Sequence, residues 1–266
     1  MHDSPAGTEQ SPRSYPAKPT DVYLFGTCLV DLFDPDAGMS AVKLLEREGI
    51  RVHFPQDQSC CGQPAYTSGF PEEARRVAGA QLGLFPQSWP IVVPSGSCAG
   101  MMRHHWPVLF AEDAERLPAA TAIAARIYEL TEFLVHVCNV KLAEHGGSGA
   151  KCRTVLHTSC SARREMGTHL SSRALLAQLP GVDTAMQSHE SECCGFGGVF
   201  SLRHPDISGA MAADKVDALE ETGAEVLVSA DCGCLANLNG TLEKRGSRLR
   251  GQHIATFLWQ RTGGGV

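Results

Sequence analysis

The stretch Cys60-Cys61-Gly62 returns later in the chain as Cys193-Cys194-Gly195, and this repeat decides the fold. A lone cysteine precedes each pair by 32 or 33 positions, and another follows it by 37 or 40 positions. Self-similarity at a nearly fixed offset, here 132 to 136 residues, indicates two copies of one structural module. The two series are Cys28, Cys60, Cys61 and Cys98, then Cys160, Cys193, Cys194 and Cys234.

Short apolar runs lie in front of the lone cysteines of both series. Residues 22–25 and 154–156 precede the first cysteine of each series, and residues 91–93 and 226–228 precede the last. Because turn residues bound these runs, we predict buried strands there. Helical patterns such as residues 163–179 separate the strands. Strands that alternate with helices predict an α/β fold, here two tandem repeated modules with largely parallel sheets.

The module boundaries follow from composition. Residues 1–20 are rich in Ser, Pro, Ala and Gly, which predicts a disordered leader. The first module is expected over residues 21–144 and the second over residues 152–260, with a glycine-rich linker at 144–149. The first module is expected to close with an amphipathic helix over residues 127–137.

The position and number of the cysteines predict a metal or redox site. In α/β sheets ligands bind at the carboxyl ends of the strands, which is where these cysteines fall. Eleven cysteines in 266 residues without a secretion signal argue against a disulfide framework. Each series offers four thiols, the usual number for an iron–sulfur cluster. Zinc ligands usually come from cysteines two to four residues apart, so two [4Fe-4S] clusters are favoured and zinc is the alternative.

Several further residues are candidates for roles near the clusters. Cys232 precedes Cys234 by two positions, and we consider it a possible extra ligand in the second module. Cys138 and Cys152 have no counterpart in the repeat, which favours a structural role for both. His157 and His189 lie three and four residues before a predicted ligand cysteine. Either histidine is a candidate to lie beside a cluster and tune it or move protons.

The charge and hydropathy of the chain exclude several classes of partner. The formal net charge is −6 and the pI is about 6.0, whereas nucleic-acid and anionic-membrane binding need a basic surface. No segment has the pattern of a transmembrane helix or a signal peptide. We therefore predict no nucleic-acid partner, no membrane insertion and a cytoplasmic location, where thiols remain reduced.

Six motifs surround the cysteines: Cys28-Leu29-Val30-Asp31, Cys60-Cys61-Gly62-Gln63-Pro64-Ala65, Pro94-Ser95-Gly96-Ser97-Cys98, Glu129-Leu130-Thr131-Glu132-Phe133-Leu134, Glu192-Cys193-Cys194-Gly195-Phe196-Gly197-Gly198 and Gly233-Cys234-Leu235. These motifs resemble the lactate utilization protein A family, which is related to the cysteine-rich subunit of heterodisulfide reductase and to the glycolate oxidase iron–sulfur subunit. The resemblance implies an iron–sulfur electron-transfer subunit of a complex that oxidises L-lactate to pyruvate. It also implies two partners, a ferredoxin-like iron–sulfur protein and a third subunit. On this basis the chain is expected to be an oxidoreductase subunit rather than a complete enzyme.

Two positions depart from the related heterodisulfide reductases. Those enzymes use extra cysteines to hold non-cubane clusters, and this chain has Ser95 and Asp231 where the extra ligands would fall. The departure argues against disulfide-cleaving chemistry. A thiol–disulfide reductase subunit, with Cys232 as a fifth thiolate, and a zinc-stabilised binding module without redox function remain the alternatives.

Overall fold

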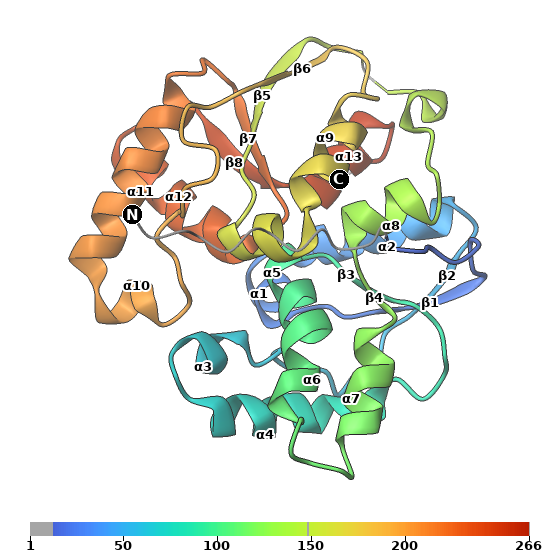
Figure 1. The fold of residues 1–266 in the computed structure, drawn as a ribbon. Helices are drawn as coiled ribbons and strands as arrows, with labels where there is room; N and C mark the ends of the chain where they lie inside the picture. Colours follow the sequence, from blue (N-terminus) through green and yellow to red (C-terminus); the bar gives the residue numbers. More distant parts are fainter. Residues whose placement is uncertain (1–12, 148, 266) are drawn as a thin grey trace, which may run out of the picture.

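The computed structural model describes residues 13–147 and 149–265, and each half of this chain builds one four-stranded parallel sheet (Figure 1). The strand order is β2-β1-β3-β4 in the first sheet and β6-β5-β7-β8 in the second, so the two sheets have the same topology. This confirms the predicted α/β class with parallel sheets. The strands are β1 (Asp21–Leu24), β2 (Arg51–His53), β3 (Ile91–Val93), β4 (Ile127–Glu129), β5 (Cys152–Leu156), β6 (Val182–Ala185), β7 (Val226–Ser229) and β8 (Arg250–His253).

The central strand pairs keep the same register in both sheets. In the first sheet Tyr23 of β1 pairs with Ile91 of β3, and in the second Thr154 of β5 pairs with Val226 of β7. The chain leaves β1 toward β2 on one side and later returns to place β3 on the other side. The strand order therefore reverses between β1 and β3, and likewise between β5 and β7, which is where open α/β sheets bind ligands.

The helices connect and cover these strands. In the first half they are α1 (Cys28–Phe33), α2 (Pro35–Arg47), α3 (Gln63–Thr67), α4 (Pro71–Gln81), α5 (Gly96–Gly100), α6 (Trp106–Leu109), α7 (Leu117–Ala124) and α8 (Leu130–His136). In the second half they are α9 (Thr168–Leu176), α10 (Phe200–Arg203), α11 (Pro205–Glu220), α12 (Cys232–Lys244) and α13 (Ile254–Arg261). Shorter 3-10 turns occupy Leu82–Leu84 and Leu142–His145, and π-helical turns occupy Met101–His105 and Ala162–Met166.

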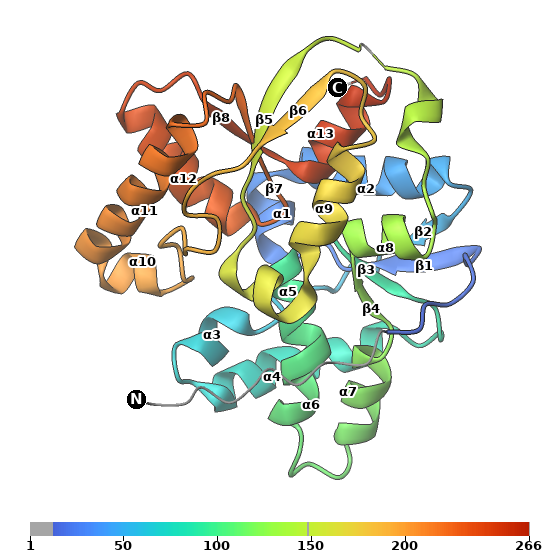
Figure 2. The same ribbon diagram turned by 45° about the horizontal axis from the view of Figure 1, so that its top comes forward.

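The two sheets share one layer of helices. Helices α2, α8, α9 and α13 lie between the sheets, while α4, α6 and α7 cover the outer face of the first sheet and α11 and α12 that of the second (Figures 1 and 2). Side chains alternate between the two faces of the sheet along β1 and the residue after it. Val22 and Leu24 pack in the shared core between the sheets, and Tyr23 and Phe25 pack in the core beneath the outer helices. The shared core also takes Leu156 from the second sheet, so the two halves are packed as one body.

Equivalent helices of the two halves contact each other in a reciprocal way. Helix α2 packs on α13, and α9, which takes the place of α2 in the second half, packs on α8. Helix α1 contacts α12, and the π-helical turn Ala162–Met166 contacts α5 in the matching arrangement. This reciprocity is the pattern of a two-fold interface between copies of one unit. It brings the segments that follow β1, β3, β5 and β7 together near the middle of the molecule.

The structure corrects three local predictions. The stretch 127–137 is not one helix, because Ile127 pairs with Ile91 in the sheet and Glu129 then caps α8 by accepting hydrogen bonds from Thr131 N and Glu132 N. The stretch 163–179 is broken at Gly167, whose φ of 64° ends the π-helical turn before α9 begins.

The third correction concerns the predicted leader. Residues 1–12 lie outside the described residues. From residue 13 the chain lies on the first sheet, because Arg13 Nη1 donates to Ile127 O at 3.0 Å and the ring of Tyr15 stacks on His136 with 4.5 Å between centroids. An ion pair between Arg13 and the mostly buried Glu132 adds to this attachment. Arg13 and Tyr15, within the stretch predicted as a leader, are therefore attached to the first half of the protein.

Candidate metal centres

The lone cysteines lie where the chain leaves the central strands of each sheet. Cys28 is the first residue of α1, after β1, and Cys98 lies in α5, after β3. In the second sheet Cys160 follows β5, and Cys234 lies in the first turn of α12, after β7. Each set therefore has its outer members at the point where the strand order reverses. Hydrogen bonding to the neighbouring thiol, together with burial, raises the pKa values of Cys28 and Cys160.

The vicinal cysteines of both sets lie in the same tight turn. Gly62, with φ of 89°, donates its N–H to Cys60 Sγ at 3.4 Å, and Gly195, with φ of 82°, donates to Cys193 Sγ at 3.4 Å. A Cβ on Gly62 would lie 3.1 Å from the carbonyl oxygen of Ala74, and one on Gly195 would lie 2.5 Å from that of Ser208. Both the left-handed backbone and the close approach therefore require glycine.

A second hydrogen bond holds each turn from the helix side. The indole Nε1 of Trp106 donates to the carbonyl oxygen of Cys61 at 2.9 Å. In the second half Asn237 Nδ2 donates to the carbonyl oxygen of Cys194 at 2.7 Å. The two donors lie at different sequence separations from the last cysteine of their sets, yet they bind equivalent carbonyl groups in the two halves. The backbone of each Cys-Cys-Gly turn is thus fixed on both sides.

The four thiols of each set meet in an unbroken chain of contacts. Cys60 interacts with Cys28 and Cys61 through hydrogen bonds, and Cys61 also reaches Cys98. Hydrogen bonds from Cys28 and Cys61 lower the pKa of Cys60 to about 3, and the equivalent bonds lower the pKa of Cys193 to about 2. Each set therefore holds a thiolate at neutral pH, and all eleven cysteines are free. The second set repeats these links among Cys160, Cys193, Cys194 and Cys234.

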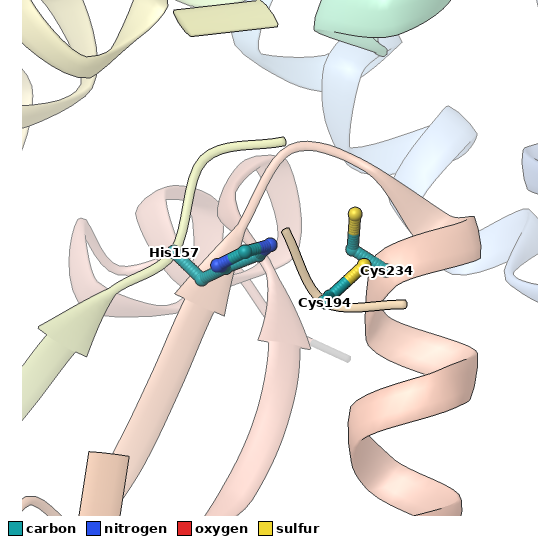
Figure 3. Close-up of side chains that lie close together, drawn as sticks. All are labelled: His157, Cys194 and Cys234. Atoms are coloured by element: carbon teal, nitrogen blue, oxygen red, sulfur yellow. The ribbon is translucent and has the colours of Figure 1, made fainter. Parts of the chain in front are cut away.

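The second set has a histidine where the first set has a phenylalanine. His157 lies three residues before Cys160, as Phe25 lies three residues before Cys28, and both side chains are fully buried. A ring nitrogen of His157 and the sulfur atoms of Cys194 and Cys234 all lie within 4.8 Å of one another. Figure 3 shows the imidazole directly after β5, turned toward Cys194 on its loop and Cys234 on α12. Burial lowers the pKa of His157 to about 3, so the ring is neutral.

A buried lysine is the second difference between the sets. Ala74 and Ser208 hold equivalent positions, because each supplies the carbonyl oxygen nearest to a Cβ placed on Gly62 or Gly195. Seven residues further along the chain, Gln81 of α4 therefore corresponds to Lys215 of α11. Gln81 binds Ser59 in front of the first cysteine pair, whereas Lys215 Nζ donates to the carbonyl oxygen of His189. Burial lowers the pKa of Lys215 to about 8, and the thiol of Cys194 interacts with its charge.

A hydrogen-bonded bridge joins the two sets. The carboxylate Oδ1 of Asp231 accepts from Ser95 Oγ at 2.9 Å and from Ser97 N at 3.0 Å, across the interface between the halves. Ser95 in turn caps α5 by accepting from the N–H of Cys98. Cys232 is buried beside this bridge, against Val30 and Ala37, and interacts with both Cys98 and Cys234. Ser95 and Asp231 therefore connect the helix starts that carry the last cysteine of each set.

The predicted residues are distributed as follows. The structure brings the eight repeat cysteines into two groups of four and leaves Cys138 in the shared core, away from both. Cys232 is buried and interacts with the charge of the last cysteine of each group, and His157 lies beside the second group. The imidazole of His189 turns to the surface, where it is 47% exposed and its Nδ1 lies 2.6 Å from a carboxylate oxygen of Glu192.

Two contributions to the sites are not among the residues predicted from the sequence. Lys215 and its counterpart Gln81 lie outside the cysteine motifs. An alignment of the two halves on the prolines that begin α4 and α11 would have paired these two residues. The bond between Asp231 and Ser95 joins residues 136 positions apart, and no local pattern carries that information. In the sequence both residues of the bridge stand out only as positions where a cysteine is lacking.

Comparison with known proteins identifies the family. The family described as "Cysteine-rich domain" matches this chain twice, over residues 22–103 and 154–239. Lactate utilization protein A of Shouchella clausii is 42% identical over 240 residues, which cover 90% of this chain and 98% of the relative. The chain belongs to the lactate utilization protein A family. The member from Bacillus subtilis is 42% identical over 237 residues, covering 89% of this chain and 98% of its own length.

The fold also has a solved counterpart. A hypothetical protein from Helicobacter pylori matches with a TM-score of 0.64 and 11% identity, covering 98% of this chain and 52% of that one. At this identity the match concerns the arrangement of the elements alone. Among the described residues of this lactate utilization protein A family member, no helix is long and apolar enough to cross a membrane.

Proposed function

We propose that this member of the lactate utilization protein A family is an iron–sulfur electron-transfer subunit with two [4Fe-4S] clusters. One is held by the set that contains Cys60 and Cys61, and the other by the set that contains Cys193 and Cys194. The observation that carries the proposal is the pair of matched sets of four free thiols, each at the reversal point of a parallel sheet. Free thiols of this kind persist in a reducing compartment, which supports the cytoplasm as the location.

The residues present fit such clusters. Each set has four sulfur donors from three separate segments, and one donor already has a pKa far below that of a free thiol. The N–H groups of Gly62 and Gly195 point at cysteine sulfur, and hydrogen bonds to cluster sulfur help to set reduction potentials. The zinc alternative is weaker, because structural zinc sites usually take cysteines two to four residues apart, whereas each set here extends from Cys28 to Cys98 or from Cys160 to Cys234.

In this proposal the protein residues hold and shield the electron carrier. A bound iron–sulfur cluster supplies one-electron transfer. Phe25 packs in the apolar cluster that contains Cys61 and Cys98 and so limits the access of water to these thiols. The bridge from Asp231 to Ser95 fixes the distance between the two sets, which electron transfer between them requires.

Metal and sulfide analysis tests the proposal directly. Full-length protein purified without oxygen is expected to contain about eight iron and about eight acid-labile sulfide per chain, four of each in every set. Electron paramagnetic resonance of the reduced protein would identify the cluster type. Zinc without sulfide would contradict the proposal and favour the zinc-stabilised binding module.

Lactate is proposed as the source of electrons on the strength of the family's name and of its full-length match to this chain. No flavin or nicotinamide motif is present in the sequence, and hydride removal from lactate needs such a cofactor or its equivalent. We therefore assign the chemical step to partner subunits, one of them a ferredoxin-like iron–sulfur protein.

Anaerobic absorbance spectroscopy with and without these partners tests the assignment. Lactate should bleach the cluster absorbance of this chain only when the partners are present. Bleaching by lactate alone would contradict a purely electron-transferring role, and no bleaching in the complete mixture would remove lactate as the substrate.

Thiol–disulfide reduction is the second candidate, and the position of Cys232 favours it. Its buried thiol interacts with the charges of Cys98 and Cys234, and burial raises its pKa, so a metal rather than solvent would have to stabilise its thiolate. A reductase predicts that Cys232→Ala abolishes electron transfer to a disulfide substrate. An electron-transfer subunit predicts no disulfide reduction in either protein.

A further inference from the structure

His157 has no hydrogen-bond partner within the part of the chain that the structure describes. Both ring nitrogens are buried and unpaired, and the side chain is 0% exposed. A buried polar atom without a partner costs about 1–3 kcal/mol, so native proteins rarely keep one without a reason. Two such atoms on a single ring indicate that the imidazole meets a group that is bound in the mature site.

The thiols of the second set are the groups that this ring faces. One nitrogen lies within 4.8 Å of Cys194 Sγ and Cys234 Sγ, which also lie within 4.8 Å of each other. Each iron of a [4Fe-4S] cluster has one protein ligand, so a nitrogen donor at this place would replace one thiolate of the set.

The first set supplies an internal comparison. Phe25 occupies the position of His157 and packs in the apolar cluster that contains Cys61 and Cys98. It offers no donor atom, so the first set has only sulfur ligands. The backbone turns, the strand order and the thiol contacts match in the two sets, and the nitrogen donor belongs to one of them.

We propose that His157 is a nitrogen ligand to iron in the second centre, where it takes the place of one of the four thiolates, and that the two centres therefore differ in ligand type. This inference rests on the proposed function, because it requires iron in the second set. A neutral imidazole adds no negative charge, and clusters with histidine ligands have higher reduction potentials than those with cysteine alone. The second centre is then expected to accept electrons before the first.

Pulsed electron paramagnetic resonance with ¹⁵N-labelled histidine tests the ligand. Full-length protein with Cys60→Ala and Cys61→Ala isolates the second centre, and protein with Cys193→Ala and Cys194→Ala isolates the first. The second centre should show a coupling typical of a directly bound histidine nitrogen, and the first should show none. In the second-centre protein, His157→Phe should remove the coupling and lower the midpoint potential toward that of the first centre.

A second variant keeps the test decisive if His157→Phe fails to hold its centre. His157→Cys supplies a thiolate in place of the imidazole, so it should retain iron and lose the nitrogen coupling. A second centre with iron and sulfide but no histidine coupling would overturn the inference and leave the proposed function intact. A coupling that persists in His157→Cys would also overturn it. Protein without iron and sulfide would overturn the proposed function, and this inference with it.

Discussion

The two halves of the molecule have the same frame and different linings around their thiols. Strand order, register and the Cys-Cys-Gly turns agree between them, down to the N–H···S distance of 3.4 Å in both turns. Around this frame the first set has Phe25 and Gln81, and the second has His157 and Lys215. Backbone geometry positions the thiols, whereas individual side chains beside them set charge and ligand type. Two centres on one fold can therefore differ in chemistry without any change in topology.

Removing one cysteine should produce the largest difference between the two centres. Cys61→Ala and Cys194→Ala each remove a buried member of one set, and each protein should lose about half of its iron and sulfide. The other half should be retained, because each centre takes its ligands from one half of the chain. Cys138→Ala is the matched control, since this buried cysteine lies outside both sets and should keep the full content. Loss of both centres from either single variant would contradict independent sites.

The glycines after the cysteine pairs should differ in how well they tolerate substitution by alanine. Alanine in the left-handed region costs about 1–2 kcal/mol, and this strain applies to both positions. At Gly195 the new Cβ would also lie 2.5 Å from the carbonyl oxygen of Ser208, against 3.1 Å from that of Ala74 at Gly62. Gly195→Ala should therefore lower the free energy of unfolding by about 3 kcal/mol and Gly62→Ala by about half of that. Urea denaturation measures both, and equal losses would show that the close approach at Gly195 is relieved by movement of α11.

The last residues of β4 and β8 should give opposite pH dependences. Burial raises the pKa of Glu129 to about 8, so the folded state binds more protons than the unfolded state between about pH 4.5 and 8. Stability therefore falls as pH rises through this window, by at most about 1.4 kcal/mol per pH unit. Burial lowers the pKa of His253, at the equivalent position, so its contribution is lost as pH falls below about 6.5.

Urea denaturation between pH 5 and 8 separates these contributions. Glu129→Gln should remove the decline in the free energy of unfolding above pH 5. It should leave the loss of stability at acid pH that comes from His253. An unchanged pH profile in this variant would show that Glu129 titrates normally.

The smallest expected effect concerns the bridge between the halves. Ser95→Ala removes the cap on the N–H of Cys98 and the hydrogen bond to Asp231 Oδ1, at a cost of about 1 kcal/mol. Ser97→Ala is the comparison variant, because it keeps the backbone N–H that reaches Asp231 and removes only the contact of Ser97 Oγ with Ser95 Oγ at 3.3 Å. Thermal denaturation should show a larger decrease in the midpoint temperature for Ser95→Ala than for Ser97→Ala, and equal decreases would argue against the cap.

Sequence patterns predicted the central strands but not the edge strands. The four apolar runs correspond to β1, β3, β5 and β7, which are the middle pairs of the two sheets. The edge strand β2 has the sequence Arg-Val-His and β8 has Arg-Gly-Gln-His, and neither contains an apolar run. Edge strands pair on one side only and are partly exposed, so their residues need not be apolar. Their position follows from pairing with a neighbour, which a local pattern does not contain.

The repeat by itself determined the class of fold, the two matched cysteine sets and their place after the strands. These features are local, because a run of apolar residues followed by a cysteine encodes both the strand and the position of the thiol at its end. The tertiary structure decided what surrounds the thiols. Packing of α2, α8, α9 and α13 into a shared core brought Asp231 to Ser95, and folding of the second half buried His157 against Cys194. Such contacts join distant segments, so they exist only after the chain has packed.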